Sequence, residues 1–207
     1  KRVDNPWLSR AAQSLAEALR LSASKVLDIE FTELVTGYRL RESARMAYVD
    51  VYLYDSLSSG AGYAISVSNV IESLLSQTES LLAGCDCEDA CYKCLKHYRN
   101  QYVHGLLDRH AALDLLRWGK TGERAKKLSF KTQEKLLNPL TIILKQMGCI
   151  LVFENNSIFV KKGNKEKKVI VYPAMWVEPI ERETIFISDA YLKYAKPYAL
   201  QKIVESL

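Results

Sequence analysis

Residues 85–94 read CDCEDACYKC, which places Cys85, Cys87, Cys91 and Cys94 within ten residues. Zinc prefers four ligands at the corners of a tetrahedron, and closely spaced cysteines can reach one ion when a tight turn presents one pair and a helix start presents the other. Four protein ligands leave no position for water, so such a site stabilises structure and does not activate a nucleophile. The spacing therefore predicts one structural zinc ion (Zn2+).

Other interpretations of this cysteine cluster remain open. Disulfides would close very small loops, and no secretion signal indicates an oxidising compartment. An iron–sulfur cluster also uses four thiolates, and the spacing alone does not exclude it. Three nearby histidines could substitute as ligands, but four cysteines make this unnecessary, so we interpret them as helix-surface or packing residues, with His97 the closest reserve: His97, His104 and His110. Cys149 lies in an apolar run, so we interpret it as a buried core residue.

The fold class predicted from the sequence is α+β, with a zinc-stapled helical and hairpin module first. Alternation of Val49, Val51 and Leu53 with polar or tyrosine residues is typical of a half-buried strand. We predict these elements in order: a helix beginning at Asp4-Asn5-Pro6 and running to Leu27, strands at Phe31–Leu40 and Met46–Leu57 joined through Arg41-Glu42-Ser43, a turn at Ser58-Ser59-Gly60-Ala61-Gly62, a helix through Leu82, a helix start near Cys94, Leu95 and Tyr98, and a helix capped by Asp108 and closing at Gly119.

A small basic α+β domain is predicted to follow a polar linker. The domain limits are 1–119 for the zinc-binding module, 120–128 for the linker and 129–207 for the second domain. We predict these elements in the second domain: a helix from Thr132 to Met147, strands at Cys149–Phe153, Ser157–Lys162, Lys168–Tyr172 and Ile185–Ile187, turns at Asn155-Asn156 and Gly163-Asn164, and a helix at Asp189–Leu207 kinked by Pro197.

Charge is distributed unevenly between the two regions. Residues 120–207 contain 16 Lys/Arg and 9 Asp/Glu, whereas residues 1–119 contain 13 and 15. A basic region is consistent with a nucleic-acid partner, although dispersed lysines are also common on solvated surfaces. The candidate nucleic-acid contacts are five lysines in one stretch: Lys161, Lys162, Lys165, Lys167 and Lys168.

Signs of catalysis are weak. Gly119-Lys120-Thr121 resembles the end of a phosphate-binding loop, but the glycine required five residues earlier is Asp114. Glu166-Lys167-Lys168 contains the E-x-K of some nucleases, with Glu154 the only acidic residue shortly before it. Gly60-Ala61-Gly62 is interpreted either as a tight turn or as an anion cradle at a helix start, and Asp55 either caps this turn or binds a partner. The sequence therefore indicates no catalytic residue.

A series of motifs around the cysteines resembles one known family. The motifs are Leu53-Tyr54-Asp55-Ser56-Leu57, Gly60-Ala61-Gly62-Tyr63, the four cysteines, Leu95-Lys96-His97-Tyr98-Arg99-Asn100-Gln101, His104 and Leu107-Asp108-Arg109. Together they resemble the MrfA-like zinc-binding domain near the C-terminus of superfamily 2 DEAD/DEAH-type helicases. Such helicases act in mitomycin-damage repair and in anti-phage systems such as Druantia and DISARM. The resemblance covers about residues 5–119.

The resemblance implies a non-catalytic accessory region of an ATP-dependent DNA helicase, in genome maintenance or anti-phage defence. The implied partners are DNA, upstream helicase motor domains, and defence or repair subunits. A start at Lys1 leads us to expect further chain upstream. The alternatives are a protein–protein docking module and a nuclease-like tail. No apolar run is long enough to cross a bilayer, so we predict a cytoplasmic protein without membrane contact.

Overall fold

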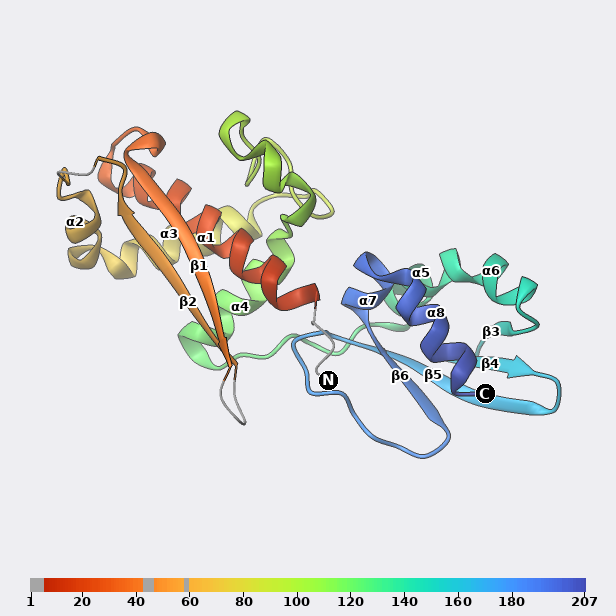
Figure 1. Ribbon diagram of the computed structural model, residues 1–207. Coiled ribbons are helices and arrows are strands. Elements are labelled where there is room, and N and C mark those ends of the chain that lie inside the picture. Colours follow the sequence, from red (N-terminus) through yellow and green to blue (C-terminus); the bar gives the residue numbers. More distant parts are fainter. Residues whose placement is uncertain (1–5, 43–46, 58–59) are drawn as a thin grey trace. The chain divides into compact units, whose positions relative to one another are not determined.

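The computed structural model describes residues 6–42, 47–57 and 60–207, which divide into two compact units (Figure 1). The first unit is Leu8–Glu123 and the second is Arg124–Leu207 with the described residues Pro6 and Trp7, and the division after Glu123 falls inside the stretch predicted as a linker. Independent folding of the two units remains a prediction. Parts of three predicted features lie outside the described residues: the Asp4-Asn5 helix cap, the hairpin connection with the following strand start at Met46, and the Ser58-Ser59 turn.

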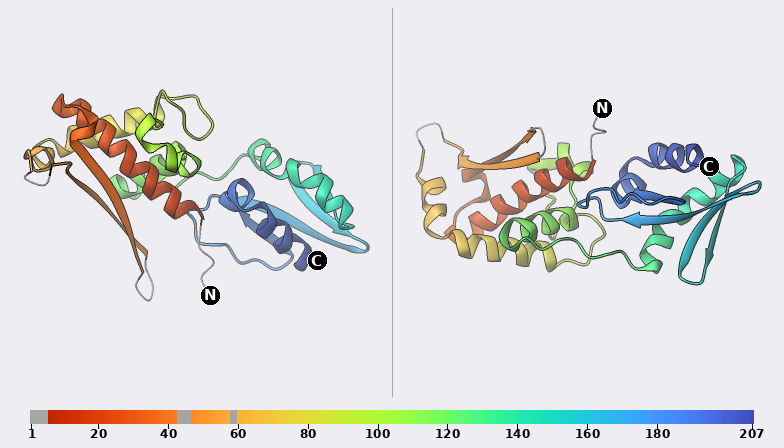
Figure 2. Two further views of the ribbon diagram at one scale, coloured as in Figure 1. Left: turned by 45° about the horizontal axis from the view of Figure 1, so that its top comes forward. Right: turned by 90° about the horizontal axis from the view of Figure 1, so that it is seen from below.

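The first unit is built around one long helix. The right-hand view of Figure 2 shows α1 lying between a two-stranded hairpin and the pair α3 and α4. Its elements are α1 (Pro6–Leu27), the 3-10 turn η1 (Phe31–Glu33), β1 (Leu34–Glu42), β2 (Ala47–Asp55), α2 (Tyr63–Asn69), α3 (Ile71–Ala83), the 3-10 segment η2 (Tyr98–Leu106) and α4 (Arg109–Thr121).

Small residues allow other elements to approach α1 closely. Its buried alanines are Ala11, Ala12, Ala16, Ala18 and Ala23. The strands β1 and β2 pair antiparallel from Leu34 opposite Asp55 to Glu42 opposite Ala47. Leu34 and Leu53 share one face of this hairpin and pack with Ala23 against α2 and α3. The opposite face carries the exposed Tyr52 and Tyr54, so the predicted half-buried alternation is confirmed.

Three predicted helices in the first unit differ from the structure. The helix predicted through Leu82 is two helices, because Val70 leaves helical geometry at φ −124° and ψ 24°. The segment after the cysteines is a 3-10 helix with a kink at Asn100, where φ is −112°. Asp108 caps α4 as predicted, but the helix continues past Gly119 to Thr121 and ends at Gly122, whose φ of 72° suits glycine.

The second unit is a four-stranded sheet with four helices. The strand order is β3-β4-β5-β6, antiparallel except for the parallel pair β5 and β6. Its elements are α5 (Phe130–Leu137), the 3-10 turn η3 (Asn138–Leu140), α6 (Thr141–Gln146), β3 (Ile150–Glu154), β4 (Ser157–Lys162), β5 (Lys165–Tyr172), β6 (Thr184–Ser188), α7 (Asp189–Tyr194) and α8 (Lys196–Glu205). All four predicted strands and the Asn155-Asn156 turn, with φ of 50° and 56°, are present.

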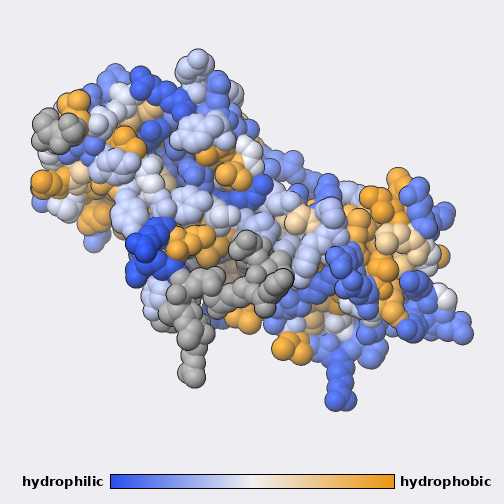
Figure 3. Space-filling view, in the orientation of Figure 1, coloured by the Kyte–Doolittle hydropathy of each residue, from blue (hydrophilic) through white to orange (hydrophobic). Residues whose placement is uncertain are grey.

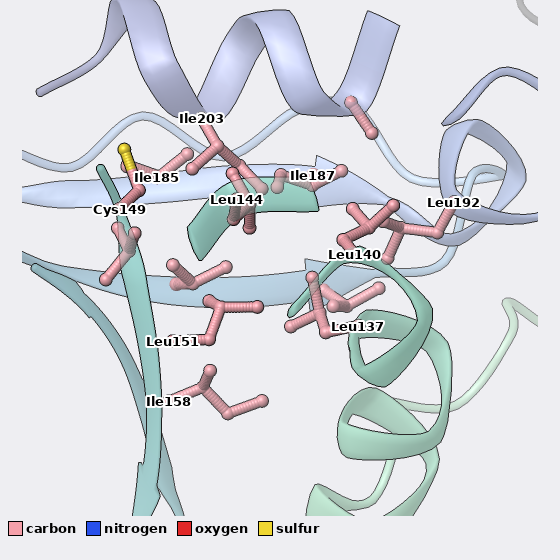
Figure 4. Packing of buried hydrophobic residues seen from close by; sticks show 14 residues of the cluster. Leu137, Leu140, Leu144, Cys149, Leu151, Ile158, Ile185, Ile187, Leu192 and Ile203 are labelled. Atoms are coloured by element: carbon pink, nitrogen blue, oxygen red, sulfur yellow. The ribbon is translucent and has the colours of Figure 1, made fainter. Parts of the chain in front are cut away.

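One face of this sheet carries the hydrophobic core. Figure 4 shows Leu151 and Ile158 of the sheet pointing toward Leu137, Leu140 and Leu144 of the α5–α6 region. Leu192 and Ile203 add the two C-terminal helices to the same cluster. Cys149 is fully buried in this core, as predicted. The second unit is therefore stabilised by continuous apolar packing.

The predicted helix boundaries in the second unit also change. The helix expected from Thr132 to Met147 begins at Phe130, capped by the Ser129 hydroxyl, and is interrupted by η3 at Pro139. The helix expected from Asp189 is broken at Ala195, and Pro197 lies in the first turn of α8, where a proline costs no hydrogen bond. Trp176 donates a hydrogen bond to the Ala125 carbonyl, so part of the predicted linker packs on this unit.

Figure 3 shows both apolar and polar side chains on the surface of each unit, with a group of apolar ones over α6. Among the described residues, no helix combines the length and the apolar character needed to span a membrane.

Candidate metal centre

The four predicted cysteines converge in a loop between α3 and η2. The loop begins at Gly84, where a Cβ atom would lie only 2.8 Å from the Ser80 carbonyl oxygen. Glycine therefore lets the chain leave α3 closely enough to present Cys85. Farther along, the Cys91 carbonyl accepts hydrogen bonds from the backbone N–H groups of Cys94, Leu95 and Lys96. This tight turn directs the second cysteine pair back toward the first.

The sulfur positions fit a tetrahedral zinc site. The Sγ atoms of the four cysteines all lie within 4.8 Å of one another. The individual separations are 3.5 Å for Cys85 and Cys91, 3.6 Å for Cys87 and Cys94, and 3.9 Å for Cys91 and Cys94. A tetrahedron with Zn–S distances of about 2.3 Å has edges of about 3.8 Å. The donor set and its spacing therefore match one zinc ion, with no position left for water.

Arg109, at the start of α4, holds this loop in place. Its Nε donates to the Cys87 carbonyl and its Nη1 to the Leu82 carbonyl, each at 2.9 Å. Its backbone N–H donates to the Asp89 carbonyl at 2.8 Å. One buried guanidinium thus joins α4 to the last turn of α3 and to the cysteine loop at Cys87.

The thiols have different proton affinities before a metal binds. Burial, together with hydrogen bonds from the other cysteines, raises the pKa of Cys87 to about 12. Burial also raises the pKa of Cys94. The Lys93 backbone N–H, which donates to Cys91 Sγ at 3.4 Å, lowers the pKa of Cys91 to about 7. Zinc binds thiolates, so metal binding must release protons from this site.

A buried polar network connects the cysteine loop to α1. Glu17 Oε2 accepts hydrogen bonds from Asn100 Nδ2 and Arg20 Nη2, each at 3.2 Å, and lies 3.1 Å from His97 Nε2. His104 Nε2 lies 2.8 Å from Asn100 Oδ1. His97 and His104 are therefore members of this network rather than reserve zinc ligands. His110 is exposed on α4.

Sequence reasoning missed Glu17 and Arg20, and it assigned no role to Asn100 or Arg109, although both lie in the motifs that carry the family resemblance. One available signal was Glu17 itself, because it lies between Ala16 and Ala18 on the small-residue helix. A carboxylate among alanines at buried helical positions indicates a polar partner from elsewhere in the chain.

The five candidate lysines do not form one surface. Strand pairing places Lys161 opposite Glu166 and Lys162 opposite Lys165 in the β4–β5 hairpin. Because side chains alternate along a strand, Lys161 and Lys168 lie on one face, and Lys162, Lys165 and Lys167 on the other. Lys161 forms a 2.8 Å ion pair with Glu166, whose carboxylate raises the pKa of Lys161.

The weaker sequence motifs have structural explanations. The carboxylate of Asp55 accepts hydrogen bonds at 3.1 Å from the backbone N–H groups of Gly62 and Ala64. The start of α2 is thus occupied by a carboxylate of the chain itself, as the capping interpretation predicts. Glu166 is paired with Lys161, and in the described part of the chain the cysteines form the one group of side chains able to hold a metal. The nuclease interpretation therefore gains no support.

Comparison with known families agrees with the geometry of the metal centre. Residues 15–95 match the sequence profile of the MrfA Zn-binding domain. This stretch contains α1 from Leu15 onward, the hairpin, α2, α3 and all four cysteines. The chain therefore contains an MrfA-like zinc-binding domain, and its cofactor is a structural zinc ion.

A curated relative extends the similarity beyond the zinc-binding domain. The chain is 35% identical over 167 residues to the Druantia protein DruE of Escherichia coli (strain UMEA 4076-1). The match covers 78% of this chain and 9% of that relative, so the chain spans about a tenth of its length. A match of that size is longer than the first unit and must include part of the second, where the sequence alone suggested no relationship. No solved structure matches the chain.

Proposed function

We propose that this chain is a zinc-stabilised, non-catalytic accessory region of an ATP-dependent DNA helicase in a Druantia-type anti-phage defence system. In this proposal Cys85, Cys87, Cys91 and Cys94 are the zinc ligands. The observation that carries it is the closed four-sulfur site in a chain related to the Druantia protein DruE. A site without an open coordination position supports a structural role rather than catalysis.

In this proposal the second unit contacts DNA. Lys162, Lys165 and Lys167 share one face of the β4–β5 hairpin, and Lys162 and Lys165 are exposed. Lysines on one face can contact neighbouring phosphates, whereas Lys161 is already paired with Glu166. We therefore assign the weak, salt-sensitive phosphate contact to the face with three lysines.

The test measures the affinity of the zinc-loaded chain for DNA by fluorescence anisotropy, at salt concentrations between about 50 and 200 mM. We expect affinity to fall steeply with salt, and the slope to become shallower when Lys162, Lys165 and Lys167 are all changed to Gln. The matched control changes Lys161 and Lys168 to Gln and should leave the slope nearly unchanged. Absence of DNA binding even at the lowest salt would overturn the nucleic-acid part of the proposal.

A second candidate function, docking to another part of a defence complex, is favoured by an apolar patch on the second unit. Figure 3 shows apolar side chains gathered over α6. The exposed members from α6 to the start of β3 are Ile142, Ile143, Met147 and Ile150. If this patch docks the helicase motor, Ile142→Glu will abolish capture of the separately expressed motor domains. Ile180→Glu, at another exposed isoleucine outside the patch, is the control.

A further inference from the structure

Three tyrosines beside the cysteines are unusually exposed. Tyr92, Tyr98 and Tyr102 have exposed fractions of 69%, 83% and 83%, the highest of any aromatic side chain in the described residues. All three lie within eleven residues that begin directly after Cys91. Aromatic rings normally contribute large buried areas to a fold. Three of them left in solvent in one short segment indicate a surface that binds something.

The exposure of these rings belongs to a fixed surface rather than to a loose segment. Leu95 and Asn100 from the same stretch, and Val103 directly after it, are buried. Asn100 Nδ2 donates to the Leu95 carbonyl at 2.9 Å as well as to Glu17, which connects the segment to α1. In Figures 1 and 2 the segment, coloured yellow-green, projects from the helices of the first unit. The rings are therefore displayed on a supported, protruding lobe.

Basic residues alternate with these tyrosines. Residues 90–107 contain Lys93, Lys96 and Arg99 and no aspartate or glutamate, whereas the acidic residues of the loop all precede Cys91. Lys93 and Arg99 are exposed beside Tyr92 and Tyr98. A zinc ion bound by four thiolates carries two negative charges, and Asp86 and Glu88 are exposed before Cys91, so the positive charge is confined to the segment after Cys91. The surface thus combines aromatic faces with positive charge.

We propose that this tyrosine platform, Tyr92, Tyr98 and Tyr102 with Lys93, Lys96 and Arg99, binds single-stranded nucleic acid. Bases stack on the rings while the basic side chains contact the phosphates, which is how proteins bind single strands without sequence preference. Bases in a duplex are already stacked on each other, so their faces are not available to tyrosine. Lysine is depleted in protein–protein interfaces, so Lys93 beside Tyr92 and Lys96 between Tyr92 and Tyr98 favour nucleic acid over a protein partner. The proposal rests on the proposed function and names the surface that serves it.

The test compares binding of a fluorescein-labelled oligothymidylate of about 20 nucleotides with binding of a duplex of equal length. The protein is the zinc-loaded chain of 207 residues. The variant with both Tyr98→Ala and Tyr102→Ala should bind the single strand at least about tenfold more weakly. Changing the same two residues to Phe should restore binding, because the rings remain. The matched control, Tyr52→Ala with Tyr54→Ala on the exposed hairpin face, should bind as the unchanged chain does. Zinc content and circular dichroism verify that each variant is folded.

The outcomes separate this inference from the broader function. Loss of single-strand binding in the alanine variant, with duplex binding unaffected, supports the platform. Unchanged single-strand binding, or equal weakening for single strand and duplex, overturns the platform while leaving DNA engagement by the lysine face intact. A chain that binds neither probe at low salt overturns both proposals.

Discussion

The two units of this chain are stabilised in different ways. The second unit has one continuous cluster of buried apolar side chains between its sheet and helices (Figure 4). The lobe of the first unit between Gly84 and Asp108 buries few large side chains, chiefly Leu95, Val103 and Leu107. Its loops are fixed by the sulfur cluster, by Arg109 and by the Glu17 network instead. The comparison teaches that a segment too small for its own core can be ordered by a metal and buried polar groups.

Removal of zinc should expose this difference most strongly. A structural zinc contributes on the order of 10 kcal/mol or more to folding, so Cys94→Ser or treatment with a chelator should unfold the lobe. The second unit contains none of the four cysteines, so its backbone amides should remain protected from hydrogen exchange. Hydrogen exchange measured by mass spectrometry, together with elemental analysis, checks both statements.

Cys149→Ala provides the matched control for the zinc experiment. This cysteine is buried in the apolar core and lies outside the metal cluster. The variant should retain one zinc per chain and lose a little stability in the second unit alone. If Cys149→Ala reduced zinc content, or if Cys94→Ser left the lobe protected, the contrast between the units would be wrong.

The reverse experiment targets the apolar core of the second unit. Leu144 is fully buried in that core, so Leu144→Ala should destabilise the second unit by about 3 kcal/mol. Urea unfolding followed by hydrogen exchange should show the loss in residues 124–207 and unchanged zinc content. Ile142→Ala, at an exposed neighbour on the same helix, should have almost no effect. A loss of zinc in Leu144→Ala would contradict independent stabilisation.

The sequence predicted the metal centre better than it predicted the buried polar residues that hold the cysteine loop in place. Close spacing of the four cysteines leaves few ways to place their sulfur atoms, and the structure brings them together. Hairpin turns such as Asn155-Asn156 were predictable because both residues tolerate positive φ. The network of Glu17 with Asn100 was not, because its partners lie 83 positions apart and no local pattern connects them.

The sequence also did not predict which lysines share a face of the hairpin or where the helices break. The five candidate lysines lie in one stretch of sequence, but strand alternation divides them between two faces of the β4–β5 hairpin. Pro197 suggested a kink inside a helix, whereas it begins α8 after the break at Ala195. Both depend on backbone geometry set by packing, and residue types alone do not specify it.

A smaller effect should follow from weakening the polar network. Glu17→Gln keeps the size of the side chain but removes the charge that accepts hydrogen bonds from Arg20 and Asn100. Charge-assisted hydrogen bonds contribute roughly 1.5–3 kcal/mol, so we expect a loss of about 2 kcal/mol in the first unit. Chemical denaturation of the zinc-saturated protein measures it. Glu72→Gln, an exposed glutamate on α3, is the control, and equal stability of the two variants would contradict a structural role for the network.

The smallest effect concerns pH. Burial lowers the pKa of His97 below its ordinary value of 6.5, although the Glu17 carboxylate opposes this shift. The unfolded chain therefore takes up a proton on this histidine first as pH falls. Keeping His97 neutral therefore contributes to the stability of the folded chain above pH 6.5, and this contribution is lost as pH falls below 6.5. An NMR titration of the zinc-bound protein should place the His97 midpoint below 6.5, and Glu17→Gln should lower it further, since the opposing charge is removed. A midpoint above 6.5 would mean that the ion pair with Glu17 outweighs burial, and the lobe would then gain stability in acid until its cysteines are protonated and release zinc.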